Sequence, residues 1–141
     1  MSINELNCYL NGLFDTASSV SVWMGPSYVK AYLFDNNSFE KELKESFKLN
    51  AGVFIYSGLS FGDLIYQLFG YENETDKRVS QSLIYHIKKE LGEPEFADVI
   101  DDEYMEILEK RNSPFPFTYV EEAAVVRFEK YTLLLVTGNN E

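Results

Sequence analysis

The C-terminal part of the chain constrains the fold most, because it has the pattern of a β-hairpin. Residues 124–128 and 131–136, Ala-Val-Val-Arg-Phe and Tyr-Thr-Leu-Leu-Leu-Val, are two largely apolar runs with strong strand propensity. Glu129 and Lys130 separate the runs and form the predicted turn, and residues 137–140 end the second run. The strands of a hairpin are antiparallel, so the sheet that contains them cannot be wholly parallel.

Before the hairpin, apolar residues recur at helical spacing in five segments. The first follows the capping box of Ser2 and Glu5, and Gly92 ends the most regular stripe. The first predicted helix runs from residue 2 to about 17. The second is the segment that Asn37 can cap, with Phe39, Leu43 and Phe47 on one face. The other three cover 61–69, about 79–91, and Asp98 to Lys110.

Three further short runs are predicted strands, over 20–24, 27–34 and 53–56. The run 53–56 is entirely apolar, which predicts a strand that is buried on both faces. Pro114 and Pro116 make residues 112–117 a loop. The sequence therefore predicts a single α+β domain over residues 1–141. In it, a mainly antiparallel sheet of about five strands, including the hairpin, packs against about five helices.

Length and charge limit the classes of function. No apolar run of the 141 residues approaches the ~20 residues that span a bilayer, and the N-terminal segment lacks the basic start of a secretory signal. We therefore expect a cytoplasmic protein with no membrane partner. The net charge of −11 argues against direct nucleic-acid binding, which requires basic side chains to neutralise phosphates. A basic partner suits this charge better.

One motif raises the possibility of an enzyme. Residues 58–62, Gly-Leu-Ser-Phe-Gly, match the G-x-S-x-G elbow that presents a nucleophilic serine in α/β-hydrolases. The serine needs a base, but His86, which is the one histidine, lies within a predicted helix. Ser60 and Asp63 also match the start of a helix, where Ser60 accepts the amide of Asp63. A helix cap is the preferred interpretation, and no catalytic residue is assigned.

No cofactor or metal site is predicted either. The chain has no P-loop and no G-x-G-x-x-G motif. His86 and Glu90 are four residues apart on one helix, but the sequence supplies no third ligand beside them. Cys8 is the single cysteine, so neither a disulfide within the chain nor a cysteine metal cluster can form.

A run of acidic residues stands out from the rest of the chain. Between Glu90 and Glu109, nine of the 23 acidic residues fall within 20 positions, with no Lys or Arg among them. A solvated helix usually mixes charge signs, because like charges three or four residues apart repel. We therefore expect the predicted helix over 98–110 to bind a partner. The candidate residues are Asp98, Asp101, Asp102, Glu103, Glu106 and Glu109.

Four functions fit these features. The preferred hypothesis is a small acidic binding protein that inhibits a basic toxin or nuclease, as immunity proteins and antitoxins do. The second is a DNA mimic of the anti-restriction or phage type, whose carboxylates imitate phosphates. The third is an adaptor that pairs or dimerises through its terminal strand, residues 131–136, with the oligomeric state left open. The fourth is a hydrolase that uses Ser60.

Overall fold

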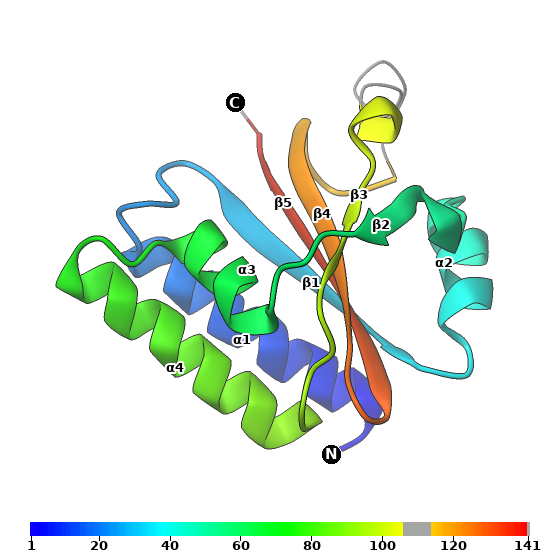
Figure 1. Cartoon of the computed structure of the whole chain (residues 1–141), viewed down its shortest axis with the longest axis horizontal. Helices are drawn as coiled ribbons and strands as arrows, with labels where there is room; N and C mark the ends of the chain where they lie inside the picture. Colours follow the sequence, from blue (N-terminus) through cyan, green and yellow to red (C-terminus); the bar gives the residue numbers. More distant parts are fainter. Residues whose placement is uncertain (106–113, 141) are drawn as a thin grey trace.

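A five-stranded antiparallel sheet forms the centre of the computed structural model, which describes residues 1–105 and 114–140 (Figure 1). The strand order across the sheet is β1-β5-β4-β3-β2, and each neighbouring pair is antiparallel. The strands are β1 (Tyr28–Asp35), β2 (Phe54–Tyr56), β3 (Asp98–Ile100), β4 (Tyr119–Arg127) and β5 (Tyr131–Asn139). The predicted α+β class and single sheet are confirmed.

Helices lie on both faces of this sheet (Figure 1). They are α1 (Ile3–Val20), α2 (Phe39–Phe47), α3 (Phe61–Phe69), α4 (Glu74–Leu91) and the 3-10 helix η1 (Ala51–Val53). The long helices α1 and α4 pack with α3 against one face, and their apolar side chains form a single core cluster with that face. The shorter α2, η1 and the segment around Phe115 and Phe117 form a second cluster on the other face.

The predicted hairpin is confirmed and supplies the most buried strand. Seven of the nine residues of β5 are buried, because β5 lies between β1 and β4 with core on both faces. Both sides of β5 are therefore already hydrogen-bonded within the sheet. β5 therefore has no free edge at which another strand could pair, and the oligomeric state stays a prediction.

The predicted strand over 20–24 is also wrong. α1 extends to Val20, and the following residues form a turn that a buried carboxylate holds. Asp76, at the start of α4, accepts hydrogen bonds from the amides of Val22 and Trp23 at 2.9 and 3.1 Å. Ser21 fastens the same turn to α3 by donating its hydroxyl to the carbonyl of Phe69 at 2.9 Å. These long-range bonds override the local β propensity of the segment.

The predicted helix over 98–110 begins as a strand. Asp98–Ile100 forms β3, which pairs with β2 on one side and β4 on the other. Helical geometry begins only at residue 102, and residues 106–113 lie outside the described part of the chain. The helical spacing of the apolar residues did not predict this strand, because its pairing with both β2 and β4 depends on distant segments.

Two smaller predictions also need correction. β2 is not buried on both faces, because it forms the edge of the sheet and only Phe54 of its three residues is buried. An apolar run does not reveal how many neighbours a strand will have. The N-cap of α2 is Ser38 rather than Asn37, and its side chain makes no capping bond.

Candidate functional site

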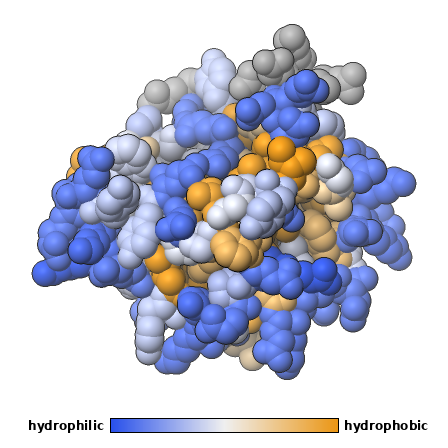
Figure 2. Space-filling model, in the orientation of Figure 1, coloured by the Kyte–Doolittle hydropathy of each residue, from blue (hydrophilic) through white to orange (hydrophobic). Residues whose placement is uncertain are grey.

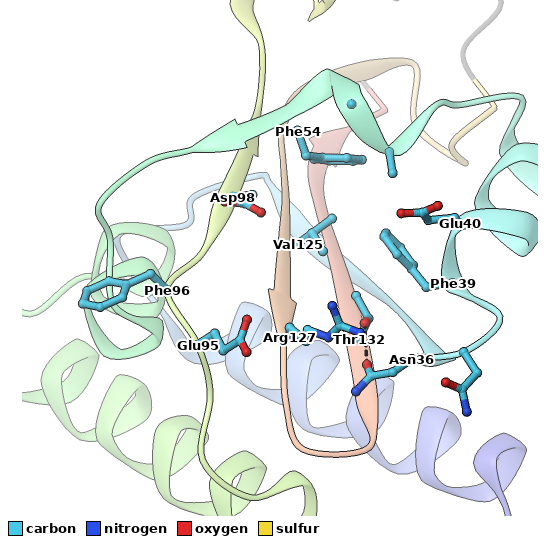
Figure 3. A pocket seen from close by; sticks show the side chains of 13 residues that line it. Asn36, Phe39, Glu40, Phe54, Glu95, Phe96, Asp98, Val125, Arg127 and Thr132 are labelled. Carbon is cyan, nitrogen blue, oxygen red and sulfur yellow. Dashed lines mark hydrogen bonds between the residues drawn. The ribbon is translucent and has the colours of Figure 1, made fainter.

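The clearest concave site lies on the sheet face that α2 covers (Figure 3). α2 and η1 leave part of this face open, above Val125, Arg127 and Thr132. The resulting cavity has a volume of about 650 Å³. Strand register explains how these residues meet: Val125 lies opposite Asp98 of β3, and Arg127 lies opposite Thr132 of β5. We call this cavity the acidic cleft.

Two walls of different origin enclose the acidic cleft. Phe39 and Glu40 of α2 form one wall, and Glu95 and Phe96, which precede β3, form the other (Figure 3). Phe54 of β2 lies at one end, beside η1. The walls therefore alternate carboxylates with aromatic rings, a combination that suits a cationic group with an apolar stem.

Hydrogen bonds hold the floor of the cleft in place. The hydroxyl of Thr132 donates to Asn36 Oδ1 at 2.7 Å. Asn36 Nδ2 donates in turn to the carbonyls of Phe128 and Glu129, at 3.0 and 3.1 Å. The amide of Glu95 donates to the carbonyl of Arg127 at 2.8 Å. These bonds attach both walls to the hairpin, so the cleft is pre-formed, which lowers the entropic cost of binding.

Among the described residues, the carboxylates of the cleft outnumber its cations. It contains the carboxylates of Glu40, Glu95 and Asp98 against the single guanidinium of Arg127. None of these four side chains forms an ion pair in the described ranges, where the pairs present are Arg78–Glu74 and Lys88–Glu93. Arg127 extends toward Thr132, its cross-strand neighbour (Figure 3). The carboxylates therefore keep their negative potential for a ligand.

The arrangement of carboxylates in the cleft disfavours the ionisation of Asp98. Partial burial raises the pKa of its carboxyl above the usual value, and the nearby charge of Glu95 raises the pKa further. Both causes disfavour the ionised form of Asp98. A cation bound in the cleft would favour that form again, so occupation of the site and ionisation of Asp98 are linked.

The predicted partner-binding residues do not form one surface. Asp98 lines the cleft, but Asp101 is the cap of the turn that follows β3, where its carboxylate accepts from the amide of Glu103 at 3.3 Å. Asp102 and Glu103 are exposed on that helical turn. Glu106 and Glu109 lie outside the described residues.

Sequence reasoning missed most of the cleft. Glu40, Arg127 and Thr132 come from three separate segments, and no local motif connects them. Glu95 belongs to the acidic run, yet it was not among the candidates because it precedes the predicted helix. The one local signal was the charged Arg127 within the otherwise apolar run 124–128.

The serine of the G-x-S-x-G motif is the N-cap of α3. Its hydroxyl accepts the amide of Asp63 at 3.1 Å, and the backbone of Gly58 has a φ of +77°, which favours glycine. The predicted cap is therefore confirmed. Ser60 lines a smaller cavity with Lys88 and Phe96, and His86 is not among the residues that line it.

In residues 1–105 and 114–140, no three or more His, Cys, Asp or Glu side chains are grouped so that they could hold a metal ion. The carboxylates of the acidic cleft are thus spread out rather than convergent. Of the helices described, none is long and apolar enough to cross a membrane.

No family model, no curated protein and no solved structure matches the chain. The function is therefore inferred from the site itself.

Proposed function

We propose that this chain is a binding protein whose acidic cleft receives a basic segment of a partner protein. The observation that carries the proposal is the set of three carboxylates, Glu40, Glu95 and Asp98, that line a cleft with aromatic walls and form no ion pair with any described residue. Carboxylates left unpaired beside aromatic rings provide both charge and apolar contact for Lys or Arg side chains.

The charge of the whole chain supports the same partner. A net charge of −11 attracts basic proteins at long range and speeds their association. The cleft then supplies the short-range contacts, because Phe39, Phe54 and Phe96 line it together with its carboxylates. Aromatic residues in partly desolvated pockets are the usual source of interface affinity.

The shape of the site indicates which part of the partner binds. A concave cleft fits a protruding loop or an extended segment better than it fits the phosphate-binding cleft of an enzyme. Inhibition of a basic toxin or nuclease in the cytoplasm, as an immunity protein or antitoxin, is the biological role that we propose. In this role the chain would hold a protruding basic element of the toxin.

The proposal can be tested with a labelled nona-arginine peptide and two matched variants. The cleft variant carries Glu40→Gln, Glu95→Gln and Asp98→Asn. The control variant carries Asp15→Asn, Glu72→Gln and Glu90→Gln, which are exposed acids outside the cleft. Both variants lose three negative charges, so long-range attraction falls equally in the two.

We expect the cleft variant to bind the peptide about tenfold more weakly than the control variant. Each contact to an exposed carboxylate contributes about 0.5 kcal/mol, and three contacts give about 1.5 kcal/mol. Fluorescence anisotropy at two salt concentrations measures both affinities. Equal affinities of the two variants would show that the peptide responds to net charge alone, and the cleft would lose its role.

A further inference from the structure

The two edges of the sheet differ in how their backbone groups are satisfied. At the edge formed by β1, side chains of α1 take the place of a neighbouring strand. Asn11 Nδ2 donates to the carbonyl of Ala31 at 2.8 Å, and Asn11 Oδ1 accepts the Ala31 amide at 2.9 Å. Asn7 Oδ1 accepts the amide of Leu33 at 2.8 Å. These two asparagines close the β1 edge against another strand.

The edge formed by β2 is open. The amide of Ser57 donates to Ala97, and the amide of Asp101 donates to Val53, at 3.3 and 2.9 Å. Antiparallel pairs alternate between hydrogen-bonded and non-hydrogen-bonded, so Ile55 points its backbone groups at β3 and Tyr56 points its own outward. The N–H and C=O of Tyr56 have no hydrogen-bond partner in the described part of the chain.

Apolar side chains flank this open edge. Tyr56 is 70% exposed, Ile55 is 49% exposed, and Phe96 is 55% exposed. The rings of Tyr56 and Phe96 meet edge to face with centroids 6.1 Å apart. Hydrophobic surface is visible over the region of β2 and β3 (Figure 2). Exposed apolar side chains beside unpaired backbone groups are the features that peptides use when they add a strand.

We infer that β2 accepts an extended basic segment of the partner as a sixth strand, an inference that rests on the proposed function. Charge complementarity selects this occupant. Glu95 and Asp98 line the cleft beside β2, and Asp102 and Glu103 are exposed just after β3. A second copy of the chain would bring these carboxylates against their own equivalents, and this repulsion opposes self-pairing.

The register specifies the pattern of the segment. Tyr56 lies opposite Asp98, and residues that face each other across strands share one side of the sheet. The partner residue opposite Tyr56 therefore lies on the sheet face that holds the acidic cleft, and its two neighbours lie on the opposite face, with Ile55. A segment that alternates basic and apolar residues therefore places its basic side chains on the sheet face that holds the cleft.

The test uses a heptapeptide of alternating Val and Lys, and a control peptide of the same composition with the Lys residues grouped together. We expect the alternating peptide to bind at least tenfold more tightly than the grouped one. At saturation, hydrogen exchange measured by NMR should slow at least tenfold at the amide of Tyr56. Similar affinity for the two peptides, or unchanged exchange at Tyr56, would overturn the inference.

Two variants distinguish the contribution of the Tyr56 backbone to peptide binding from that of its side chain. Tyr56→Pro removes the outward N–H, and proline is tolerated at an edge position whose N–H faces solvent. Tyr56→Ala removes the same ring but keeps the N–H. The amide NMR spectrum of each variant reports whether it is folded. Tyr56→Pro should weaken binding of the alternating peptide at least fivefold more than Tyr56→Ala, and equal weakening would contradict strand addition.

The same peptide distinguishes the failure of this inference from the failure of the proposed function. If the cleft variant weakens binding but the Tyr56 amide stays unprotected, the proposed function stands and strand addition is wrong. If the cleft variant binds as tightly as the control variant, the proposed function is wrong. If the protein without peptide sediments as a dimer and its Tyr56 amide is protected from exchange, the strand added to β2 is a second copy of the chain, and the inference of a basic segment is wrong.

Discussion

Replacing Asp76 with alanine should destabilise the protein more than any other single carboxylate substitution in the described residues. Asp76 is only 2% exposed and lies in the first turn of α4. Its carboxylate accepts the amides of Val22 and Trp23, at 2.9 and 3.1 Å, and Asn73 Nδ2 at 2.9 Å. The side chain thus joins α4 to the turn between α1 and β1.

The size of the effect follows from these bonds. A hydrogen bond to a charged group contributes about 1.5 kcal/mol or more. Two backbone amides and one side-chain amide lose their acceptor in Asp76→Ala, although the exposed position of Val22 and Trp23 lets water replace part of the loss. We expect the free energy of unfolding to fall by about 3 kcal/mol.

Asp63→Ala is the matched control. Asp63 holds the same position in α3, three residues after the N-cap, but it is exposed and accepts no hydrogen bond from another segment of residues 1–105 and 114–140. Only its interaction with the helix dipole is lost, at a cost of about 0.5 kcal/mol. Urea unfolding, followed by the fluorescence of Trp23, measures both variants. A loss for Asp76→Ala no larger than for Asp63→Ala would refute this account of the turn.

Three further predictions concern single residues. Asn11→Ala should lower the free energy of unfolding by about 3 kcal/mol, because it leaves the buried N–H and C=O of Ala31 unpaired, and thermal unfolding of Asn7→Ala provides the milder comparison. Ser60→Ala should cost about 1 kcal/mol in urea unfolding as a lost cap, and labelling of Ser60 by a fluorophosphonate probe would contradict that role. Asp98→Asn should stabilise the protein at pH 7, because the pKa of Asp98 is raised in the folded state and its ionisation therefore lowers stability as pH rises. The difference in free energy of unfolding between variant and wild type should become smaller as pH falls to about 4, and an increase would contradict the prediction.

Local chemistry made part of the fold predictable. The capping box of Ser2 and Glu5, the cap of Ser60 and the stop at Gly92 act within a few residues, and all three are present in the structure. The hairpin also followed from the sequence, since its turn separates two apolar runs. These signals require no knowledge of the rest of the chain.

The errors arose where distant residues decide the local structure. Residues 20–24 have strand propensity, but a carboxylate more than 50 positions away holds two of their amides in a turn. Residues 98–100 have helical spacing, but they complete a sheet between β2 and β4. In each segment, tertiary contacts outweighed a propensity that is worth less than about 1 kcal/mol per residue.

The candidate site was predictable only in its charge. The acidic run led to Asp98, which does line the cleft, but Glu40 and Arg127 come from α2 and β4. Strand register brings Asp98, Val125 and Thr132 onto one face, and register is a property of the assembled sheet. A list of acidic residues therefore indicates a basic partner without showing where that partner binds.

The pKa of Asp98 in the presence and absence of a basic peptide tests the central claim most directly. Carboxyl carbon NMR can follow the titration of Asp98 in the free protein and in protein saturated with the alternating Val and Lys peptide. A cation held in the acidic cleft favours the ionised carboxylate, so binding should lower the raised pKa of Asp98. An unchanged pKa of Asp98 in the complex would show that the basic segment does not enter the cleft.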